Sequence, residues 1–549
     1  MHLVWLSVNS SYSHSSLALP ILQLAAQHVD QWEWTSLDTT IAEHPGELAL
    51  RLEELHPDLL CTTLYLFNSL AVFEILERFK TLCPTCPVTI GGPECLGEGA
   101  EKVLRRSWAV DCAVSGEGEE CLPKIMAAIA EHRFPEPLPG TACRLGQSIQ
   151  SFAKPPLLYP DWEKAPAPVL SPFFVLDKPF VQMETTRGCP HGCVYCTSCR
   201  TPVRSKTLDQ VRQELNLLSG KGVQKIRLLD RTFNLPAKRA ANLLQLFRCE
   251  FPLLHFHLEI HPQYLNTELR GELQLARQGQ LHIEAGIQSL KPEVLQAIGR
   301  NGSAEQALDG LRFLCSCHPA FDTHADLLAG LPKQNYQDLL ADLNCLIAIG
   351  PAEIQLEILK VLPGTPLQNR TASLEILFNP NPPYEVLRTP EFPARELYQA
   401  SLLSRMIDLF YNQQFLQEPF QLACLQNPDF LCDFLAQLIH KGFSAQWVGS
   451  LRKRFQMLAD ALHSPTGVSA ASLAKQWIKA GLPLAETPFY RPEILHTLPK
   501  NAILMTGNAA ACEQVNTRLW KLAIPAETFI FAFNRALCMQ RPCTIWTIR

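Results

Sequence analysis

Three cysteines in one short loop carry the clearest chemical signal of the sequence: Cys189, Cys193 and Cys196. They are spaced Cys-x3-Cys-x2-Cys. Three thiolates can hold three irons of a 4Fe–4S cluster and leave the fourth iron open for another ligand. An open position distinguishes a catalytic metal site from a closed structural one. The spacing therefore favours a catalytic iron–sulfur centre.

A fourth cysteine, Cys199, keeps two other kinds of metal site open. A structural zinc site usually takes two separated cysteine pairs, and no second Cys-x2-Cys pair stands at zinc-ribbon distance. A ferredoxin uses the run Cys-x2-Cys-x2-Cys-x3-Cys followed by proline, which differs from the spacing in this loop. A metal-binding or electron-transfer protein without enzymatic activity would use Cys199 as a fourth ligand.

Length and composition limit the classes of protein. The chain has 549 residues, room for two to four domains, and 47% of them are hydrophobic, enough for sizeable cores. The net charge of −5 and the lack of a long basic run disfavour nucleic acid and anionic membranes as partners. We expect neither a secretory leader nor a membrane span, because no long apolar run is present. The 20 cysteines are dispersed, which favours a cytoplasmic protein with reduced thiols.

Residues 1–140 alternate short apolar strands with helical stretches, which predicts a Rossmann-like, doubly wound parallel sheet. The candidate strands are His2–Val8, Trp34–Leu37, Asp58–Leu64, Val88–Ile90 and Asp111–Val114. Two candidate helices are Ser69–Leu82 and Glu119–Glu131. Ligands of such sheets bind at the carboxyl ends of the strands, and glycines there let the backbone approach a ligand. Gly91, Gly92, Gly116 and Glu117 are therefore candidate cofactor-binding residues, although strand-to-helix turns need glycine in any case.

Residues 141–175 are rich in proline and predict an extended linker. Residues 176–367 then repeat a strand–helix rhythm six times, which predicts a partial (β/α)6 barrel of the TIM type. The candidate strands are Phe180–Thr186, Gln224–Asp230, His255–Ile260, Leu281–Ile287, Thr323–Ala329 and Ile354–Val361. Chemistry in barrels collects at the carboxyl ends of the strands, and the cysteine loop directly follows the first of them.

Polar residues at the other strand ends are further candidates for binding a cofactor. Asp230 closes the second strand, and Glu284 and Gln288 lie on the fourth. The alternative for each is an ion pair inside the barrel or a role in a turn. A helix start is also marked between the first two strands, because Thr207-Leu-Asp-Gln210 is a capping box.

Residues 368–549 open with a second proline-rich stretch, and they predict a mostly helical C-terminal domain. The candidate helices are Ala394–Asn412 and Ser444–Leu462. The candidate strands are Ala502–Thr506, Thr528–Asn534 and Cys543–Ile548. No chemical motif occurs in this segment. We expect it to cap the barrel or to bind substrate.

The order Cys-x3-Cys-x-aromatic-Cys, with Tyr195 before Cys196, resembles the signature of the radical S-adenosylmethionine (SAM) superfamily. The resemblance implies that Cys189, Cys193 and Cys196 bind a 4Fe–4S cluster whose open iron chelates SAM. Gly188 would help to shape the loop, and a polar residue of the fourth strand would contact the ribose or methionine part of SAM. Cys199 would then be a spare thiol.

The first segment resembles the cobalamin-binding domain that precedes many radical SAM domains. The pieces that carry this resemblance are Pro57-Asp-Leu-Leu60, Ile90-Gly-Gly-Pro-Glu94 and Val110-Asp-Cys-Ala-Val-Ser-Gly-Glu-Gly-Glu119. The Asp-x-His-x-x-Gly motif, which supplies an axial histidine in another class of cobalamin proteins, is absent from the sequence. The resemblance therefore implies cobalamin bound without that histidine, and His14 does not stand in such a pattern.

The pieces Asp230-Arg-Thr-Phe-Asn234 and Leu359-Lys-Val-Leu-Pro-Gly-Thr365 resemble one subgroup of these enzymes, whose C-terminal domain has no assigned function. The resemblance implies methylation of an unactivated carbon through a 5′-deoxyadenosyl radical and methylcobalamin. A rearrangement, cyclisation or oxidation without methyl transfer is the alternative. The substrate would be a small molecule, a lipid or a peptide, and a low-potential donor such as flavodoxin or ferredoxin would supply electrons.

Overall fold

A computed structural model of the chain describes residues 1–135, 137–300, 302–462, 467–507, 517–525, 527–534 and 541–548. These residues form two compact units. The first comprises Met1–Thr323, Gly330–Gln334 and Ile358–Ala394, and the second comprises His324–Ala329, Asn335–Glu357 and Arg395–Arg549. The division into four segments that the sequence predicts stays a prediction, because these units group the segments differently.

The first unit begins with a seven-stranded sheet in the order β2-β1-β3-β4-β5-β6-β7. All five strands predicted for residues 1–140 are present and pair in parallel. The strands are β1 (His2–Asn9), β2 (Glu33–Thr40), β3 (Leu59–Thr63), β4 (Val88–Gly91), β5 (Cys112–Val114), β6 (Thr141–Leu145) and β7 (Ser148–Ser151). The helices between them are α1 (Ala18–Ala26), α2 (Pro45–Glu54), α3 (Ser69–Leu82), α4 (Gly99–Arg106) and α5 (Cys121–Ala130).

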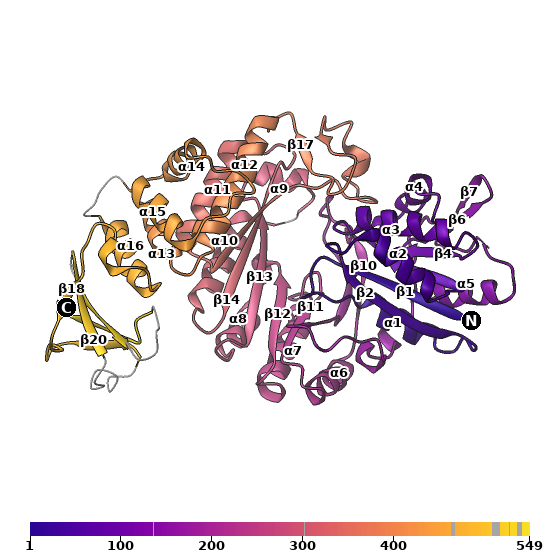
Figure 1. The fold of residues 1–549 in the computed structure, drawn as a ribbon, viewed down its shortest axis with the longest axis horizontal. Helices are drawn as coiled ribbons and strands as arrows, with labels where there is room; N and C mark the ends of the chain where they lie inside the picture. Colours follow the sequence, from indigo (N-terminus) through magenta and orange to yellow (C-terminus); the bar gives the residue numbers. More distant parts are fainter. Residues whose placement is uncertain are drawn as a thin grey trace. The chain divides into compact units, whose positions relative to one another are not determined.

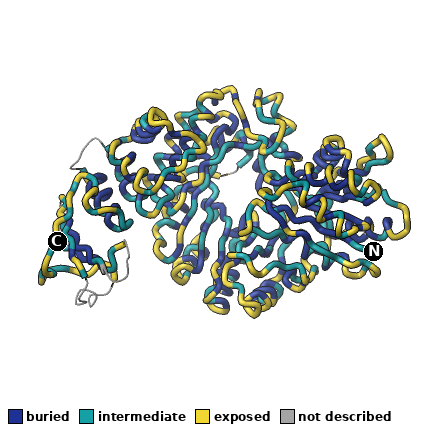
Figure 2. The backbone as a smooth tube through the Cα atoms, viewed as in Figure 1, coloured by how far each residue is buried: buried dark blue, intermediate teal, exposed yellow. Residues whose placement is uncertain are grey.

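Helices pack on both faces of this sheet, as expected for a doubly wound fold (Figure 1). On one face, residues of α2, α3 and α4 form a core with Val4 and Leu60. On the other face, residues of α1 and α5 form a second core with Trp5 and Cys61. Neighbouring residues of one strand thus face opposite layers, which is why β1 and β3 are buried along nearly their whole length (Figure 2).

Part of the predicted linker differs from the expectation of an extended segment. Residues 141–151 form β6 and β7, which pair antiparallel with each other, and β6 also pairs antiparallel with β5. The two-residue turn Gly146-Gln147 joins them, a turn length typical of β-hairpins. Further along, Leu157 pairs with Gly116 beside the end of β5. The linker is thus tied to a loop that the sequence marks as a cofactor site.

The strand–helix repeat predicted for residues 176–367 is also present. In the first unit, β8 (Val181–Met183), β11 (Lys225–Leu228), β12 (His255–Ile260) and β13 (Leu281–Gln288) are neighbours in that order and pair in parallel. The helices of this part are α6 (Leu208–Gly220), α7 (Ala237–Glu250), α8 (Thr267–Gln274), α9 (Pro292–Ala297) and α10 (Ala304–Ser316). The predicted capping box starts α6, since Thr207 and Gln210 exchange hydrogen bonds.

A small antiparallel ribbon, absent from the sequence prediction, follows β8. Its strands are β9 (Thr186–Cys189) and β10 (Thr201–Ser205), and the cysteine loop connects them. Directly after β10, Lys206 reaches α6 and pairs with Glu214, with 2.7 Å between Nζ and Oε2. Both side chains are almost fully buried, at 6% and 4% exposure. This buried ion pair therefore anchors the ribbon to the barrel.

We expect the Glu214→Ala variant to lose about 3–5 kcal/mol of unfolding free energy, because it leaves the Lys206 charge buried without a partner. Chemical denaturation of the purified protein measures this loss. The matched control is Glu250→Ala, which removes a half-exposed partner of Arg212 and should change stability by less than about 1 kcal/mol. Equal effects of the two substitutions would contradict the anchoring role.

The second unit contains most of β14 (Asp322–Ala329) and β15 (Glu353–Ile358), two neighbouring strands that complete the six predicted for the repeat. Its helices are α11 (Tyr336–Ile349), α12 (Ala394–Met406), α13 (Gln417–Gln426), α14 (Phe430–His440), α15 (Leu451–Ala461) and α16 (Val468–Lys479). A sheet follows, in the order β18 (Glu493–Leu495), β20 (Thr517–Ile524), β21 (Glu527–Asn534), β22 (Thr544–Ile548) and β19 (Ile503–Thr506).

The C-terminal elements agree with the predicted ones in type and differ at their ends. The predicted helix from Ala394 continues beyond α12 as a π-helical turn, Ile407–Tyr411. The helix predicted from Ser444 begins only at Leu451, because Ser450 caps it by accepting a hydrogen bond from the Lys453 backbone N–H. The α/β fold class expected from the sequence is confirmed. Within the described ranges, no helix combines the length and apolarity needed to cross a bilayer.

Candidate functional site

The β9–β10 ribbon positions the three cysteines at the barrel. Gly188 on β9 has a φ of +92°, and a Cβ there would lie 2.1 Å from the Pro202 carbonyl oxygen of the facing strand. Only glycine fits such an approach, so the predicted loop-shaping residue has a clear steric role. The next residue, Cys189, donates its backbone N–H to Thr201 Oγ1 at 2.9 Å. The ribbon thus fixes the backbone at the first cysteine.

The other end of the cysteine loop is held by backbone hydrogen bonds. The Val194 N–H donates to the Ile298 carbonyl after α9 at 2.9 Å, and the Val194 carbonyl accepts from Leu367 N–H at 2.8 Å. Within the loop, Arg200 N–H donates to the His191 carbonyl at 2.8 Å. Segments from three parts of the first unit therefore determine the loop conformation.

Each of the three sulfurs has at least one hydrogen-bonding group beside it. Thr232 Oγ1 lies 3.6 Å from Cys189 Sγ, and the Ser198 backbone N–H donates to Cys196 Sγ at 3.4 Å. Arg300 Nη1 donates to Cys193 Sγ at 3.7 Å. Hydrogen bonds and charge around the sulfurs of an iron–sulfur cluster set its potential. This arrangement fits thiolates that bind iron.

Two of the three thiols are buried, and the third, Cys196, is partly buried. Cys189 and Cys193 are only 8% and 7% exposed. Burial raises the pKa of Cys196, and the neighbouring Cys193 and Cys189 raise it further, while Arg231 lowers it. Among the described residues, no three Cys, His, Asp or Glu side chains are placed around a single metal ion. In a 4Fe–4S cluster, by contrast, each thiolate binds its own iron.

Cys199 lies at the end of the same loop. Its backbone N–H donates to the Cys196 carbonyl at 3.2 Å. Burial raises the pKa of this thiol too, and Arg200 opposes the shift. The assignment of Cys199 as a spare thiol rather than a ligand stays a prediction.

Aromatic rings pack behind the loop. The His191 ring stacks on Tyr264 at 5.5 Å between centroids, and it lies 5.0 Å from the ring of His261. Burial lowers the pKa of His261 to about 2, and the charges of Arg300 and His191 add to this effect. His261 is therefore neutral at physiological pH, and it packs beside the loop as an uncharged ring.

A cavity of about 380 Å³ joins the cysteine loop to the glycine-rich loops of the N-terminal sheet. Five predicted cofactor-binding residues line it: Gly91, Gly92, Gly116, Glu117 and Gly188. Residues from the barrel side also line it, among them the arginines Arg187, Arg204 and Arg231. The carboxyl ends of β3, β4 and β5 thus open into the same space as the ribbon, as doubly wound sheets require of a ligand site.

The glycines that line the cavity differ in how strictly the local structure requires glycine. Gly116 has a φ of +95°, and a Cβ would lie 2.3 Å from the carbonyl oxygen of Leu157, which pairs with it. Gly91 is less constrained, because a Cβ there would meet only Val114, at 3.9 Å. Gly116 is therefore required by the close approach of the linker, whereas Gly91 leaves room in the cavity.

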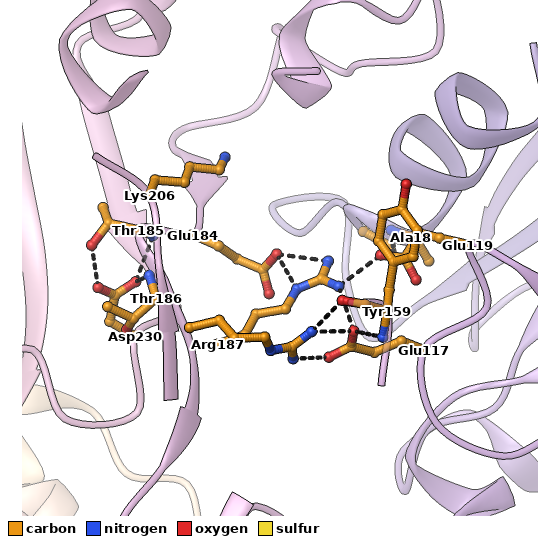
Figure 3. A network of polar contacts seen from close by, with 12 residues as sticks. Ala18, Glu117, Glu119, Tyr159, Glu184, Thr185, Thr186, Arg187, Lys206 and Asp230 are labelled. Atoms are coloured by element: carbon orange, nitrogen blue, oxygen red, sulfur yellow. Dashed lines mark hydrogen bonds and ion pairs between the residues drawn. The ribbon is translucent and has the colours of Figure 1, made fainter. Parts of the chain in front are cut away.

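The Glu117 carboxylate lies in a polar network between the N-terminal sheet and the ribbon (Figure 3). Arg204 Nη1 donates to Glu117 Oε2 at 2.9 Å, and the Tyr159 backbone N–H donates to the same oxygen at 2.6 Å. Arg187 links Glu117 to two further carboxylates. Arg187 Nη1 lies 2.6 Å from Glu119 Oε1, and Arg187 Nη2 lies 2.9 Å from Glu184 Oε2. Burial alone would raise the pKa of Glu117, but Arg204 and Arg187 lower it. The carboxylate is thus ionised and bound to protein groups.

The remaining three candidates lie outside the residues that line this cavity. Asp230 is buried and accepts hydrogen bonds from the backbone N–H groups of Thr185 and Thr186, at 2.7 and 3.0 Å, and from the Thr185 hydroxyl. It braces the start of the ribbon (Figure 3). Glu284 Oε2 contacts His257 Nε2 at 3.0 Å and Arg227 Nη2 at 3.4 Å. Contacts of these residues with a cofactor stay predictions.

Gln288 ends β13 with a left-handed backbone, at a φ of +72°. Residues other than glycine rarely adopt this backbone conformation, and such outliers cluster at functional sites. A Cβ on the neighbouring Gly286 would lie 3.1 Å from Gln288 Nε2 and 3.3 Å from Arg300 Nη2. Gln288 is thus near the guanidinium that contacts Cys193, which keeps it a candidate for the cofactor site.

The sequence prediction missed two arginines, Arg187 and Arg300. Arg187 stands two residues before the first cysteine, and a charged residue within a short buried strand is a signal that could have identified it. Arg300 has no such signal. It contacts Cys193 across 107 residues of sequence, and only the fold brings the two together.

We expect Arg300→Gln to lower the reduction potential of a cluster bound at Cys193. The reduced cluster carries one more negative charge, which the guanidinium stabilises, so its removal should lower the potential by about 60 mV or more, roughly 1.4 kcal/mol. A redox titration followed by electron paramagnetic resonance (EPR) measures this. Arg300→Lys should retain most of the potential, and Arg312→Gln on exposed α10 surface should change nothing. An unchanged potential in Arg300→Gln would contradict the expectation.

Comparison with known proteins places this site in a family context. The family model of the radical SAM superfamily matches residues 183–346, so the chain contains a radical SAM domain. An uncharacterised methyltransferase from Pyrococcus horikoshii is 23% identical, covering 61% of this chain and 74% of that protein. The cobalamin-dependent radical SAM methyltransferase TokK from Streptomyces tokunonensis is 22% identical, covering 57% of this chain and 48% of TokK. The chain thus spans about half the length of TokK.

Solved structures share the fold across both cofactor-related segments. The radical SAM methyltransferase TsrM from Kitasatospora setae, solved with cobalamin and a 4Fe–4S cluster, has a TM-score of 0.56 at 18% identity, covering 84% of this chain and 99% of TsrM. The cobalamin-dependent enzyme OxsB, solved with aqua-cobalamin and SAM, has a TM-score of 0.60 at 12% identity, covering 84% of this chain and 78% of OxsB. At these identities the likeness concerns the fold.

Proposed function

We propose that this chain is a cobalamin-dependent radical SAM methyltransferase that acts on an unactivated carbon. The observation that carries the proposal is the single cavity shared by the cysteine loop and the loops that end β4 and β5. A reaction that uses an iron-bound cofactor together with cobalamin requires both sites to open into one space. The radical SAM domain and the methyltransferases among its relatives support the same conclusion.

The residues of the chain have separate tasks in this proposal. Cys189, Cys193 and Cys196 would hold the 4Fe–4S cluster, and the glycines Gly91, Gly92 and Gly116 would let the backbone approach cobalamin. When bound, the cofactors supply a 5′-deoxyadenosyl radical and a transferable methyl group, while the protein orients them and excludes water. The Arg231 cation lines the cavity beside the cluster loop.

The proposed substrate is a small molecule, a lipid or a peptide. A low-potential donor such as flavodoxin or ferredoxin would supply the electron, which places the enzyme in a reducing, cytoplasmic compartment. Methyl transfer and a non-methylating rearrangement, cyclisation or oxidation use the same cofactors. The product mass separates them, since only methyl transfer adds one methylene to the substrate.

Anaerobic reconstitution with iron, sulfide and hydroxocobalamin tests the proposal. We expect one 4Fe–4S cluster whose EPR signal changes on addition of SAM, and about one retained cobalamin per chain. A cluster without cobalamin would overturn the methyl-transfer proposal and make the N-terminal sheet a substrate or scaffold domain. Zinc in place of iron, with Cys199 as the fourth ligand, would indicate a structural metal site.

A further inference from the structure

We propose that Arg187 is a positioning residue that sets the distance between the cluster and the cobalamin. This inference rests on the proposed function, because it assumes that both cofactors bind in the shared cavity. Arg187 lies on β9, two residues before Cys189, and its guanidinium reaches carboxylates that belong to the glycine-rich loop after β5 (Figure 3). It therefore links the chain segment at one cofactor site to the segment at the other.

The ribbon side of this link is firmly held. Asp230 accepts hydrogen bonds from the backbone at Thr185 and Thr186, and the buried Lys206–Glu214 pair anchors the end of β10. The Gly188 backbone packs directly against Pro202. A movement of the Arg187 backbone would therefore carry Cys189 with it.

The N-terminal side is held through two carboxylate contacts, with Glu117 and Glu119. Arg187 Nη1 lies 2.6 Å from Glu119 Oε1 and 3.4 Å from Glu117 Oε2, and Arg187 also pairs with Glu184 on its own side. Glu117 and Glu119 flank Gly118, directly after Gly116, and Gly116, Glu117, Gly118 and Glu119 all line the cavity. The carboxylates that contact Arg187 thus belong to the loop expected to contact cobalamin.

The link is buried, which makes it selective for arginine. The Arg187 side chain is 12% exposed, and it lies 5.1 Å above the ring of the buried Trp162. Burial alone would lower the pKa of Arg187, but Glu184, Glu119 and Glu117 together raise it. A planar guanidinium can contact several carboxylates and stack on an indole at the same time, whereas a lysine ammonium cannot. Removal of this cation would leave several carboxylates without their shared partner.

A purely structural ion pair and a positioning residue predict different results. If Arg187 only stabilised the fold, its loss would lower the stability and leave the cofactor spacing of the folded protein unchanged. If it positions the ribbon, the folded variant should bind both cofactors at an altered or variable separation. A misplacement of about 1 Å is enough to impair an enzyme strongly.

EPR spectroscopy of the reconstituted protein separates these cases. In the wild-type protein, a reduced cluster should broaden and relax the cob(II)alamin signal, because two nearby spins interact. We expect Arg187→Met to retain both cofactors, while the spin interaction between them falls by roughly two-fold or more. Arg187→Lys should give an intermediate value. Glu119→Gln, at the other end of the contact, should reduce the interaction in the same direction. It tests the proposal where Arg187→Met does not fold.

The matched control is Arg212→Met, which removes an arginine that pairs with Glu250 and Asp209 on the surface and should leave the interaction unchanged. An unchanged spin interaction in folded Arg187→Met or Glu119→Gln, with both cofactors bound, would overturn the positioning role. Failure of the wild-type protein itself to bind cobalamin or a cluster would instead overturn the proposed function.

Discussion

The Cys193→Ala variant is expected to lose the iron–sulfur cluster and all cleavage of SAM. Cys193 is the middle thiol of the loop, buried and in contact with Arg300. Two cysteines do not hold a 4Fe–4S cluster with one open iron, because three thiolates are needed for the other three irons. After anaerobic reconstitution, the visible absorbance of the cluster should be absent, and 5′-deoxyadenosine formation should fall by more than about a hundred-fold.

Cys199→Ala is the matched control, since it removes a thiol of the same loop. We expect it to retain iron, sulfide and SAM cleavage at close to wild-type levels. Loss of the cluster in Cys199→Ala would identify four-cysteine ligation and contradict an open iron. Full SAM cleavage by Cys193→Ala would exclude the proposed ligand set.

The Gly91→Leu variant is expected to bind cobalamin at least about ten-fold more weakly, a loss of roughly 1.4 kcal/mol. Gly91 ends β4 and lines the cavity, and an added Cβ would meet only Val114, at 3.9 Å. The substitution should therefore fill part of the ligand space without a clash in the backbone. Cobalamin retained after gel filtration, measured by its absorbance, gives the loss.

The control for this substitution is Gly271→Leu on α8, where an added Cβ has open space and no lining residue of the cavity is nearby in sequence. It should bind cobalamin like the wild-type protein. Thermal unfolding of both variants shows whether the fold is intact. Normal cobalamin binding by a folded Gly91→Leu protein would contradict the assignment of this cavity.

The sheet topology is the part that the sequence predicted well, whereas the three-cysteine metal site stays a prediction. Both depend on local signals: the spacing of the cysteines and the alternation of apolar strands with helices. Gly91, Gly116 and Gly188 line the shared cavity, as expected for glycines near strand ends, and their contact with a cofactor stays a prediction. These features can be read within about ten residues of the chain.

Local sequence patterns could not predict the long-range contacts that complete the site. Arg187 meets Glu119 across 68 residues and Arg300 meets Cys193 across 107, so that only the folded chain shows the pairs. The β9–β10 ribbon was missed because β10 has no apolar alternation, with Pro202 and Val203 both exposed. Asp230 has the sequence features of a cofactor ligand, a polar residue at a strand end, yet its carboxylate holds backbone N–H groups.

The hydrogen bonds that hold the cysteine loop have a consequence for the order of assembly. Thr201, Ile298 and Leu367 hold the loop through bonds in which no sulfur takes part. Zinc fingers, by contrast, gain their fold from the metal. The polypeptide should therefore fold before iron binds and exist as a folded, cluster-free apoprotein. Cellular iron supply would then limit how much enzyme is active, without changing how much of it is folded.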